Sequence, residues 1–566
     1  MRLRNWCIRR AVTGVTLGGL GLSLVLGCDT DDSVLVDGSQ GALEPRPSRN
    51  DDDEATPSAA DEDPELAEDS DAAEDEDEAE GSSSEAPPTN LGRDDAEIDP
   101  TPTPVTPTPV TPTPAPIEFW GDGVTVNGVS PDLDDRYHGV AMDAQDNAYG
   151  VGYIGAALGE NRRILVTKFD SSGQPAAGFG TAGRVEVDFS TYLGTPVSET
   201  VLTADNNGEE GRDLALQSDG KIVVVGRAED PIDLAPSTLT PIDIVVFRLD
   251  ASGARDLTFG TGGVTVLNPG NGPNDLAWGT DVDASNRIYV FGHGLATNAL
   301  DAVTPRTDQD RYVWRLNADG TLDTTFANQG VFTFDLPNGT TTLAINDNSR
   351  RGRVLPNGEI AIGGYTNVAG RNQVVLAKLL ETGSVDTSFS NDGIVRLAPF
   401  PTGMAECYGV AYQSDGSLVT TGYGNVDVER TGGAELLDMV SFRVKPDGSA
   451  DSSWGVGGAL VYDPAGAQDR GRDVIALADD RILFAGAATV VGTNKDAMLL
   501  LTEKNGALAQ NFDPAGHKVY DFGGDNEEFF SVQLSPSGKF AAAAGYATGT
   551  GLVTGNAILA IVPLGK

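Results

Sequence analysis

Three sequence patterns recur in the same order between residues 117 and 566, and they limit the possible folds more than any other feature of this chain. The first is an apolar run, a polar turn and a second apolar run ending near a glycine, as in LALQSDGKIVVVGR at 214–227. The second is a hydrophobic run that ends at a turn, as in DIVVFRLDASG at 243–253. The third is an aromatic residue, a glycine four positions later and a short strand-like run, as at 259–266. Short runs rich in Val, Ile and aromatic residues between Gly- and Asp-containing turns predict β-strands, so each unit predicts four.

The phase of the repeats predicts a closed ring. The first and second patterns each occur seven times, but the third follows the second only six times. Its seventh copy, 119–123, stands before all the others. A chain that opens with the fourth strand of a unit and closes with its first three has the permuted phase of a circular β-propeller. We therefore predict an all-β, seven-bladed β-propeller over 117–566, in which Val124–Val126 pairs with Ala557–Val562 in one blade.

The strings QSDGKIVVVG, FRLDASG and D-x-x-F-G-x-x-G resemble the bacterial delta-60 repeat family over residues 117–566, with the best copy at 211–266. Some copies depart from the pattern: Asn286-Arg287 replaces Asp-Gly, Trp454 replaces Phe, and Asp513 replaces the glycine after Phe512. The resemblance implies repeat architecture and an envelope or surface location, with no shared chemistry.

The N-terminus predicts a membrane anchor. Residues 2–10 are basic, residues 11–26 are apolar, and Val-Leu-Gly-Cys follows at 25–28. This order resembles a bacterial lipoprotein signal peptide over residues 1–28. The resemblance implies that Cys28 becomes the first mature residue and carries acyl chains such as palmitate on its sulfur and its amine. An ordinary secretory signal that contains a cysteine is the alternative. Asp29 resembles an inner-membrane retention signal of enteric bacteria, but we favour the outer membrane or the cell surface.

Residues 29–116 predict a spacer between the anchor and the repeats. Residues 29–100 carry 24 more acidic than basic side chains and almost no aromatics, so we expect an acidic disordered tether. Residues 101–116, TPTPVTPTPVTPTPAP, predict a polyproline II stalk of about 50 Å. Whether its threonines are glycosylated is left open. The net charge of −46 argues against nucleic acid and anionic lipid as partners.

Five arginines near the starts of the expected innermost strands are the candidate binding residues. They would approach the mouth of the central channel, where guanidinium groups can hold an anionic ligand through paired hydrogen bonds. Pairing with Asp213, Asp473 or acids of neighbouring blades is the alternative. The five are Arg136, Arg212, Arg351, Arg353 and Arg472.

The longest irregular segments should lie on the face opposite the tight turns, where scaffolded folds usually carry binding groups. They are 190–210, 229–241, 294–310, 335–350 and 424–437. Asp301, Asp308 and Asp310 are weak metal candidates there, because Ca²⁺ takes carboxylate oxygens. No segment has the D-x-[DN]-x-[DN]-G calcium loop, so the main prediction is no cofactor, with solvated charge at these acids.

The sequence contains no catalytic constellation that we recognise. Its only histidines, His138, His293 and His517, fall in three different units, and no G-x-S-x-G motif is present. Cys407 is expected to be a small buried residue. We interpret the chain as a monomeric, lipid-anchored propeller that acts as a binding scaffold for an unidentified protein, glycan or ion. The alternative is a secreted propeller enzyme, a hydrolase or quinone-dependent sugar dehydrogenase, with its site on the long-loop face; fold alone does not decide.

Overall fold

The structure is a computed structural model that describes residues 118–564 with gaps. The gaps are 121–123, 127–133, 156–161, 190–208, 230–241, 268–274, 296–308, 335–346, 369–370, 401–402, 426–436, 466, 491–493, 514–515, 523, 525 and 549–554. The predicted signal peptide, tether and stalk lie outside the described residues. Residues 110–566 form one compact unit, to which all described residues belong.

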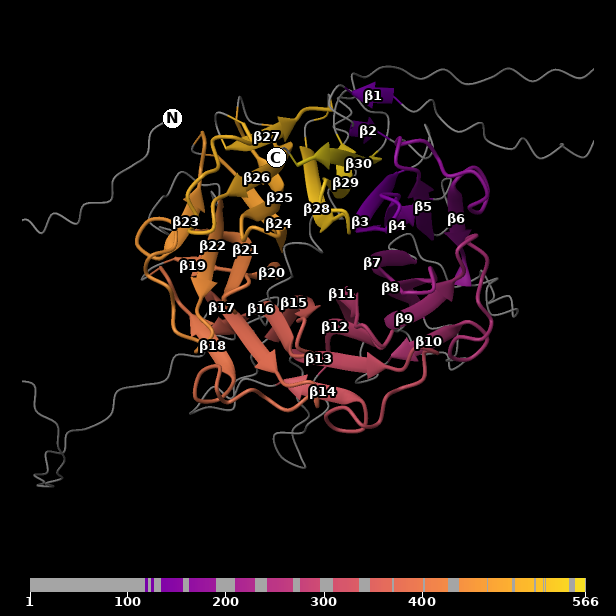
Figure 1. Cartoon of the computed structure of the whole chain (residues 1–566), viewed down its shortest axis with the longest axis horizontal. Coiled ribbons are helices and arrows are strands. Elements are labelled where there is room, and N and C mark those ends of the chain that lie inside the picture. Colours follow the sequence, from indigo (N-terminus) through magenta and orange to yellow (C-terminus); the bar gives the residue numbers. More distant parts are fainter. Residues whose placement is uncertain are drawn as a thin grey trace, which may run out of the picture. The chain divides into compact units, whose positions relative to one another are not determined.

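The described residues contain thirty β-strands in seven antiparallel sheets. Figure 1 shows these sheets, or blades, following one another around a common centre. Blade 1 comprises β3 (Asp135–Met142), β4 (Ala148–Ile154), β5 (Arg163–Phe169) and β6 (Arg184–Val187). Blade 2 comprises β7 (Glu210–Leu216), β8 (Ile222–Glu229), β9 (Ile242–Leu249) and β10 (Val264–Leu267). Blade 3 comprises β11 (Leu276–Val282), β12 (Ile288–Leu295), β13 (Gln309–Leu316) and β14 (Val331–Phe334).

The remaining blades repeat this order, with additions in blades 5 and 7. Blade 4 comprises β15 (Asp347–Val354), β16 (Ile360–Val368), β17 (Arg371–Leu379) and β18 (Ile394–Leu397). Blade 5 comprises β19 (Met404–Ala405), β20 (Gly409–Tyr412), β21 (Leu418–Asn425), β22 (Asp438–Val444) and β23 (Ala459–Tyr462). Blade 6 comprises β24 (Asp469–Ala476), β25 (Ile482–Ala488), β26 (Asp496–Thr502) and β27 (His517–Tyr520). Blade 7 comprises β28 (Asn526–Leu534), β29 (Phe540–Thr548), β30 (Asn556–Pro563), β2 (Val124–Val126) and β1 (Glu118–Trp120).

The ring is closed, as the phase of the repeats predicts. The innermost strands contact one another in the cycle β3, β7, β11, β15, β20, β24, β28 and back to β3. In blade 7, Val124 pairs with Ala560 and Val126 with Ile558. The predicted pairing of the two chain ends in one blade is therefore confirmed.

Blade 7 differs from the four-stranded prediction in one respect. Residues 118–120 form a fifth strand, β1, in which Phe119 pairs with Thr125 of β2. In the other units the aromatic residue follows the third strand of its own blade and lies in a turn. Here no strand precedes it among the described residues, and the backbone of residues 118–120 extends the sheet edge.

The turn that holds the aromatic residue of the third pattern contacts the next blade in five blades. Phe259 is fully buried, and a methyl group on Gly320 in the following blade would collide with its ring. Gly320 has a φ of +84°, which suits glycine at this turn. Beside this contact, the Gly260 amide donates to the Asp319 carbonyl at 2.7 Å. The equivalent bonds are Gly180 to Ser252 (2.8 Å), Ala327 to Thr382 (2.8 Å), Ser390 to Asp447 (3.1 Å) and Gly455 to Asn505 (3.0 Å).

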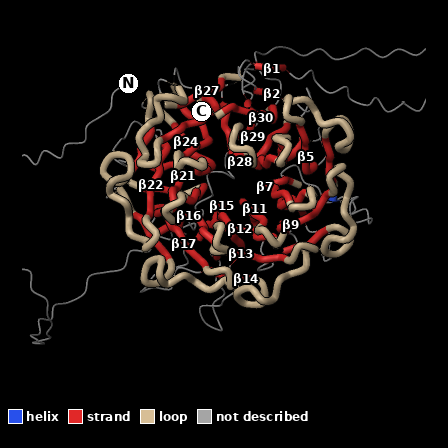
Figure 2. Tube along the Cα trace, in the orientation of Figure 1, coloured by secondary structure: helices blue, strands red, loops and turns tan. Residues whose placement is uncertain are grey.

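The charged residues of the repeat signature hold the turns of their own blades. Arg248 binds Asp256 at 2.8 Å, so the arginine of FRLDASG and the first aspartate of D-x-x-F-G form one pair. Arg315 binds Asp323 at 2.8 Å in blade 3 in the same way. Figure 2 shows many of the described loops around the periphery of the ring, where these turns join the strands. The charged residues of the repeat signature therefore stabilise the turns within these blades.

Candidate functional site: the central channel

A β-bulge interrupts the innermost strand of nearly every blade. The register shifts in β3, β7, β11, β15, β24 and β28, and blade 5 is broken between β19 and β20. A bulge sets two residues against one on the neighbouring strand and so redirects a side chain. The residues in these breaks include His138, Arg212, Trp278, Arg350, Arg351, Tyr408, Arg472 and Phe530.

A glycine on the second strand of each blade makes room for this break. A methyl group on Gly226 would collide with the Glu210 carbonyl oxygen, two residues before the bulged Arg212. The same collision, with the carbonyl of the corresponding residue, occurs at every equivalent glycine. These are Gly152, Gly292, Gly364, Gly422, Gly486 and Gly545. Because the backbones of the first and second strands approach each other closely here, a glycine recurs near the end of the first sequence pattern.

The bulged side chains stack on one another around the centre of the ring. Cations and aromatic rings alternate over most of the circuit, at separations typical of cation–π contacts. The guanidinium-to-ring distances are Arg212 to Trp278 4.7 Å, Arg350 to Trp278 4.2 Å, Arg350 to Tyr408 4.5 Å, Arg472 to Tyr408 5.0 Å and Arg472 to Phe530 5.0 Å. Phe530 then contacts His138, with ring centroids 5.3 Å apart.

His138 completes this circuit next to Arg212. Its Nδ1 lies 3.0 Å from the Gly211 carbonyl. Burial, followed by the charge of Arg212, holds the pKa of His138 well below its usual value. The imidazole is therefore neutral at pH 7, and the circuit carries its positive charge on the three arginines. We call the seven residues His138, Arg212, Trp278, Arg350, Tyr408, Arg472 and Phe530 the stacked ring.

Arg351 crosses the channel from blade 4. Its guanidinium donates to the His138 carbonyl of blade 1 at 2.8 Å and lies 3.0 Å from Asp213 of blade 2. It also lies 3.8 Å from Asp473 of blade 6. Only 7% of Arg351 is exposed. One side chain therefore links four blades at the centre of the molecule.

Aspartates on three innermost strands join neighbouring blades through backbone hydrogen bonds. Asp213 accepts from the Thr280 amide at 3.0 Å, and Asp281 accepts from the Val354 amide at 2.8 Å. Asp473 accepts from the Val532 amide at 3.1 Å. Burial raises the pKa values of Asp213 and Asp281, with Arg351 opposing the shift at Asp213 and Arg353 at Asp281.

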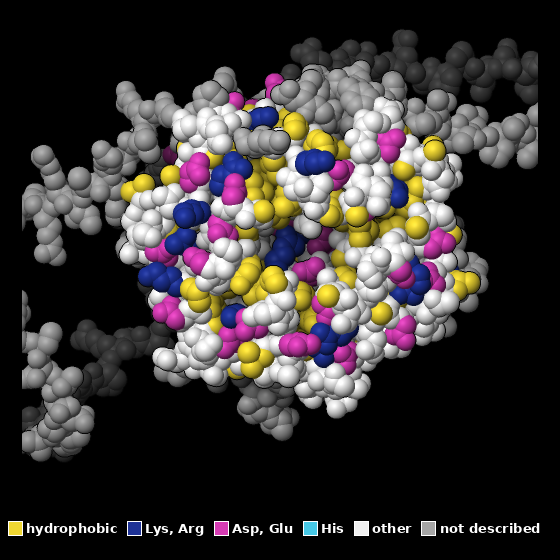
Figure 3. All heavy atoms as spheres, in the orientation of Figure 1, with side chains coloured by type: hydrophobic (Ala, Val, Ile, Leu, Met, Phe, Trp, Pro, Cys, Tyr) yellow, Lys and Arg dark blue, Asp and Glu magenta, His cyan; other side chains and the backbone are white. Residues whose placement is uncertain are grey.

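The five candidate arginines lie on the innermost strands, as expected, and each has a carboxylate close by. Arg212 is 2.7 Å from Glu210, and Arg472 is 2.7 Å from Glu528. Arg353 is 3.0 Å from Asp473, Arg136 is 3.9 Å from Asp134, and Arg351 has the partners given above. The side chain of Arg353 is 21% exposed, whereas the other four arginines are buried. Figure 3 shows Lys or Arg side chains beside Asp or Glu side chains at the centre of the face in view.

Glu210 forms the densest of these ion-pair groups. It is fully buried, and Arg162, Arg212 and Arg227 each approach it to between 2.7 and 2.8 Å. Burial opposes its ionisation, but Arg227, Arg212 and Arg162 outweigh burial and lower its pKa. The three arginines therefore keep the buried Glu210 carboxylate ionised.

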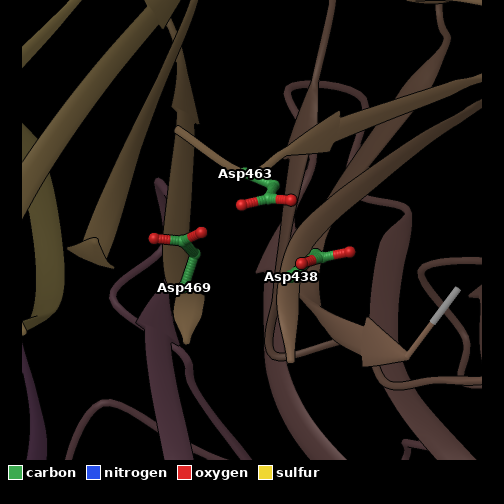
Figure 4. Close-up of side chains that lie close together, drawn as sticks. All are labelled: Asp438, Asp463 and Asp469. Carbon is green, nitrogen blue, oxygen red and sulfur yellow. The ribbon is translucent and has the colours of Figure 1, made fainter. Parts of the chain in front are cut away.

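The metal candidates of the sequence are only partly described. Asp301 and Asp308 lie outside the described residues, whereas Asp310 is buried near the start of β13. The described residues do contain two groups of three carboxylates that lie close together. They are Asp438, Asp463 and Asp469, drawn in Figure 4, and Asp496, Asp521 and Glu527.

Sequence reasoning missed these two groups and five members of the stacked ring, because it considered His138 only as one of three separate histidines. Trp278, Arg350, Tyr408 and Phe530 stand at a break whose position depends on strand register. The signal available was the recurring second-strand glycine, which marks the bulge opposite it. The long segments proposed as a binding face lie almost entirely outside the described residues. Within the described part of the chain, none of the residues forms a helix long and apolar enough to cross a bilayer.

Comparison with known proteins supports β-propeller repeats in part of the chain. The model of a β-propeller domain of unknown function, DUF5122, matches residues 217–259, 304–326 and 355–389. These segments are β-propeller repeats. No curated protein matches the chain.

Three of the solved structures that match the chain have the following scores. Polysaccharide lyase Uly1 has a TM-score of 0.45 at 11% identity, over 81% of this chain and 96% of the lyase. An α-L-arabinofuranosidase from Fusarium graminearum has a TM-score of 0.38 at 10% identity, over 76% and 93% of the two chains. The PQQ-bound aldose sugar dehydrogenase from Streptomyces coelicolor has a TM-score of 0.30 at 14% identity, over 62% and 94%. Likeness at this level assigns no activity to this chain.

Proposed function

We propose that this chain is a lipid-anchored envelope protein of the delta-60 repeat type whose propeller is a binding scaffold rather than an enzyme. Its partner would be a protein, a glycan or an ion outside the membrane. The anchor rests on the Val25–Cys28 pattern and on the long acidic and proline-rich spacer that follows it. The scaffold role rests on the chemistry of the channel.

The observation that supports a scaffold is that the charged side chains at the centre of the ring contact other residues of the propeller. Catalytic sites hold charged groups in position to meet a substrate. Here Arg351 spans four blades, Arg212 and Arg472 stack on aromatic rings, and Glu210 is enclosed by three arginines. These contacts tie the blades to one another. Binding groups would then be carried by the long segments 190–210, 229–241 and 424–437 on the opposite face from the tight turns.

The anchor is tested by Cys28→Ala in the native host. Wild-type protein should incorporate labelled palmitate and sediment with membranes, and sucrose-gradient fractions should place it with outer-membrane markers. The variant should lose the label and the sedimentation. Palmitate labelling that persists in Cys28→Ala would contradict the lipoprotein assignment.

The scaffold is tested by presenting the purified full chain to a glycan array and to envelope extracts after crosslinking. Replacing residues 424–437 with a short Gly-Ser turn should remove a specific partner, whereas Asp250→Asn in a tight turn on the other face should leave it bound. Steady turnover of a polysaccharide or a free sugar by the purified chain would instead favour the enzyme alternative.

A further inference from the structure

Three aspartates meet where blade 5 joins blade 6. Asp438 begins β22, Asp463 follows β23, and Asp469 begins β24 of the next blade. One carboxylate oxygen from each lies within 4.8 Å of one oxygen from each of the others. Figure 4 shows the three carboxylates facing a common space. Residues from two blades and three strands therefore converge on one point.

Two of these carboxylates are buried and the third opens to solvent. Asp469 is 0% exposed and Asp438 is 2% exposed, whereas Asp463 is half-buried. Asp463 is therefore the most exposed of the three aspartates.

Asp469 provides a second, independent observation. Its Oδ1 accepts a hydrogen bond from the Thr489 amide at 2.9 Å. Its Oδ2 is buried and has no hydrogen-bond partner among the described residues. A buried carboxylate oxygen without a donor costs free energy unless a proton or a cation satisfies it. Burial raises the pKa of Asp469 to about 8; the hydrogen bond from Thr489 opposes this rise, and the charges of Asp463 and Asp438 add to it.

We propose that Asp438, Asp463 and Asp469 bind one hard divalent cation, best represented by Ca²⁺, which ties blade 5 to blade 6. Carboxylate oxygens are the ligands that hard cations prefer. Ca²⁺ accepts several protein carboxylates at 2.3–2.6 Å in flexible geometry, whereas Mg²⁺ keeps most of its waters and usually takes one or two. Three carboxylates spaced as here fit the larger ion. With only three protein side chains, we expect an affinity of about 10⁻⁴–10⁻³ M, as in extracellular calcium modules.

The junction of blades 6 and 7 provides a matched control within the same chain. Asp496, Asp521 and Glu527 stand at the corresponding places, with Asp496 at the start of β26 and Asp521 just after β27. The buried Glu527 differs from Asp469 because both of its oxygens are engaged. Oε1 accepts from the Phe522 and Gly524 amides at 2.9 and 2.7 Å, and Oε2 accepts from the Phe522 amide at 2.8 Å. This carboxylate holds the connection between the blades, so we do not assign a cation to it.

The test uses the full chain, purified in detergent and freed of metal with a chelator. Thermal unfolding with added CaCl₂ or MgCl₂ reports cation binding to the folded propeller. Calorimetric titration of Ca²⁺ then gives the affinity, and the acidic tether contributes equally to every variant. The variants are Asp438→Asn and Asp469→Asn, with Asp496→Asn as the control.

Two expected results together support the site. Ca²⁺ should raise the melting temperature of wild type and of Asp496→Asn more than Mg²⁺ does. In Asp469→Asn the metal-free melting temperature should equal or exceed that of wild type, because the amide oxygen can still accept from the Thr489 amide while the buried carboxyl group is gone. The Ca²⁺ shift should then disappear, with affinity lowered about tenfold or more. A merely structural aspartate would instead lower the metal-free melting temperature when replaced.

Several results would overturn the assignment. One is a wild-type melting temperature that does not change in about 10 mM Ca²⁺, ten times the weakest affinity expected. Another is a Ca²⁺ shift that survives in both Asp438→Asn and Asp469→Asn. A third is loss of the shift in Asp496→Asn with retention in Asp438→Asn, which would move the site to the next junction.

Discussion

Replacing Arg351 with methionine tests whether the centre of the ring is structural. Methionine keeps most of the aliphatic length but removes the guanidinium that contacts His138, Asp213 and Asp473. Removing one partner of a buried ion pair typically costs about 3–5 kcal/mol, because the other charge stays buried without compensation. Asp473 keeps Arg353 at 3.0 Å, so most of the cost should arise at Asp213. We expect a loss of about 3 kcal/mol in urea-induced unfolding.

The pH dependence of that loss has a defined sign. The folded-state pKa of Asp213 is raised by burial and held down chiefly by Arg351. A carboxyl whose pKa is raised by folding destabilises the native state increasingly as pH rises through the folded value. Without Arg351 the pKa rises further, so the deficit of Arg351→Met should be largest at neutral and alkaline pH and should shrink toward pH 5.

Two further variants complete this experiment. Asp213→Asn in the Arg351→Met background should recover part of the loss, with a coupling of about 0.5–3 kcal/mol between the two sites. Arg396→Met removes an exposed arginine that pairs with the exposed Asp392 at 2.9 Å, and it serves as the control with a cost of at most about 1 kcal/mol. A loss below 1 kcal/mol for Arg351→Met, unchanged between pH 5 and 8, would refute the argument that this side chain holds four blades together.

Three other predictions follow from the same contacts. Gly226→Ala should destabilise the protein by about 1–3 kcal/mol in urea unfolding, because its methyl group meets the Glu210 carbonyl; unchanged stability would contradict the bulge geometry. Deleting residues 117–127 should lower the melting temperature sharply or give insoluble protein, since it removes β1 and β2 and leaves β30 as an open edge, whereas truncation at residue 116 should be nearly neutral. In chelator, the melting temperature should fall as pH rises through about 8, because Asp469 has a raised folded pKa, and Asp469→Asn should flatten that slope. Equal stability of the two truncations, or an unchanged slope, would count against these two arguments.

The fold could be predicted from the sequence because its signals are local and repeated. Each strand is a short apolar run beside a turn, and each blade repeats the same order. The position of ring closure followed from the phase of the third pattern alone, and β2 pairs with β30 in the predicted blade. Even the Phe259 contact with Gly320 has a sequence signal, since both residues belong to recurring motifs.

The side-chain contacts at the centre of the ring could be predicted only in part, because they depend on strand register. Strand alternation assigns faces correctly only where a strand has no bulge. In β15 the shift spans Ser349 to Gly352, so that Arg350 joins the stacked ring and Arg351 crosses the channel. Arg351 also meets the backbone of a residue 213 positions earlier in the chain. No local pattern contains that information.

The carboxylate groups had a sequence signal of another kind. Asp438, Asp463 and Asp469 are separated by 25 and 6 positions, and Asp496, Asp521 and Glu527 have the same two intervals. Comparing acids by their place in the repeat, rather than by local density, would have found both. High local charge density, as in the acidic tether and the loop acids, mainly keeps a segment solvated and does not identify these two groups.

The acidic residue at the start of the innermost strand makes different contacts in different blades. At the junction of blades 1 and 2, Glu209 accepts a hydrogen bond from the Phe189 amide at 2.6 Å. Glu527 holds the equivalent connection with both of its oxygens. Asp469 is one methylene shorter, and it uses one oxygen for the Thr489 amide while the other is left toward Asp438 and Asp463. Among the described residues between Asp463 and Asp469, no backbone amide donates to the Asp469 carboxylate. A cation bound by Asp438, Asp463 and Asp469 would join blades 5 and 6 at this position.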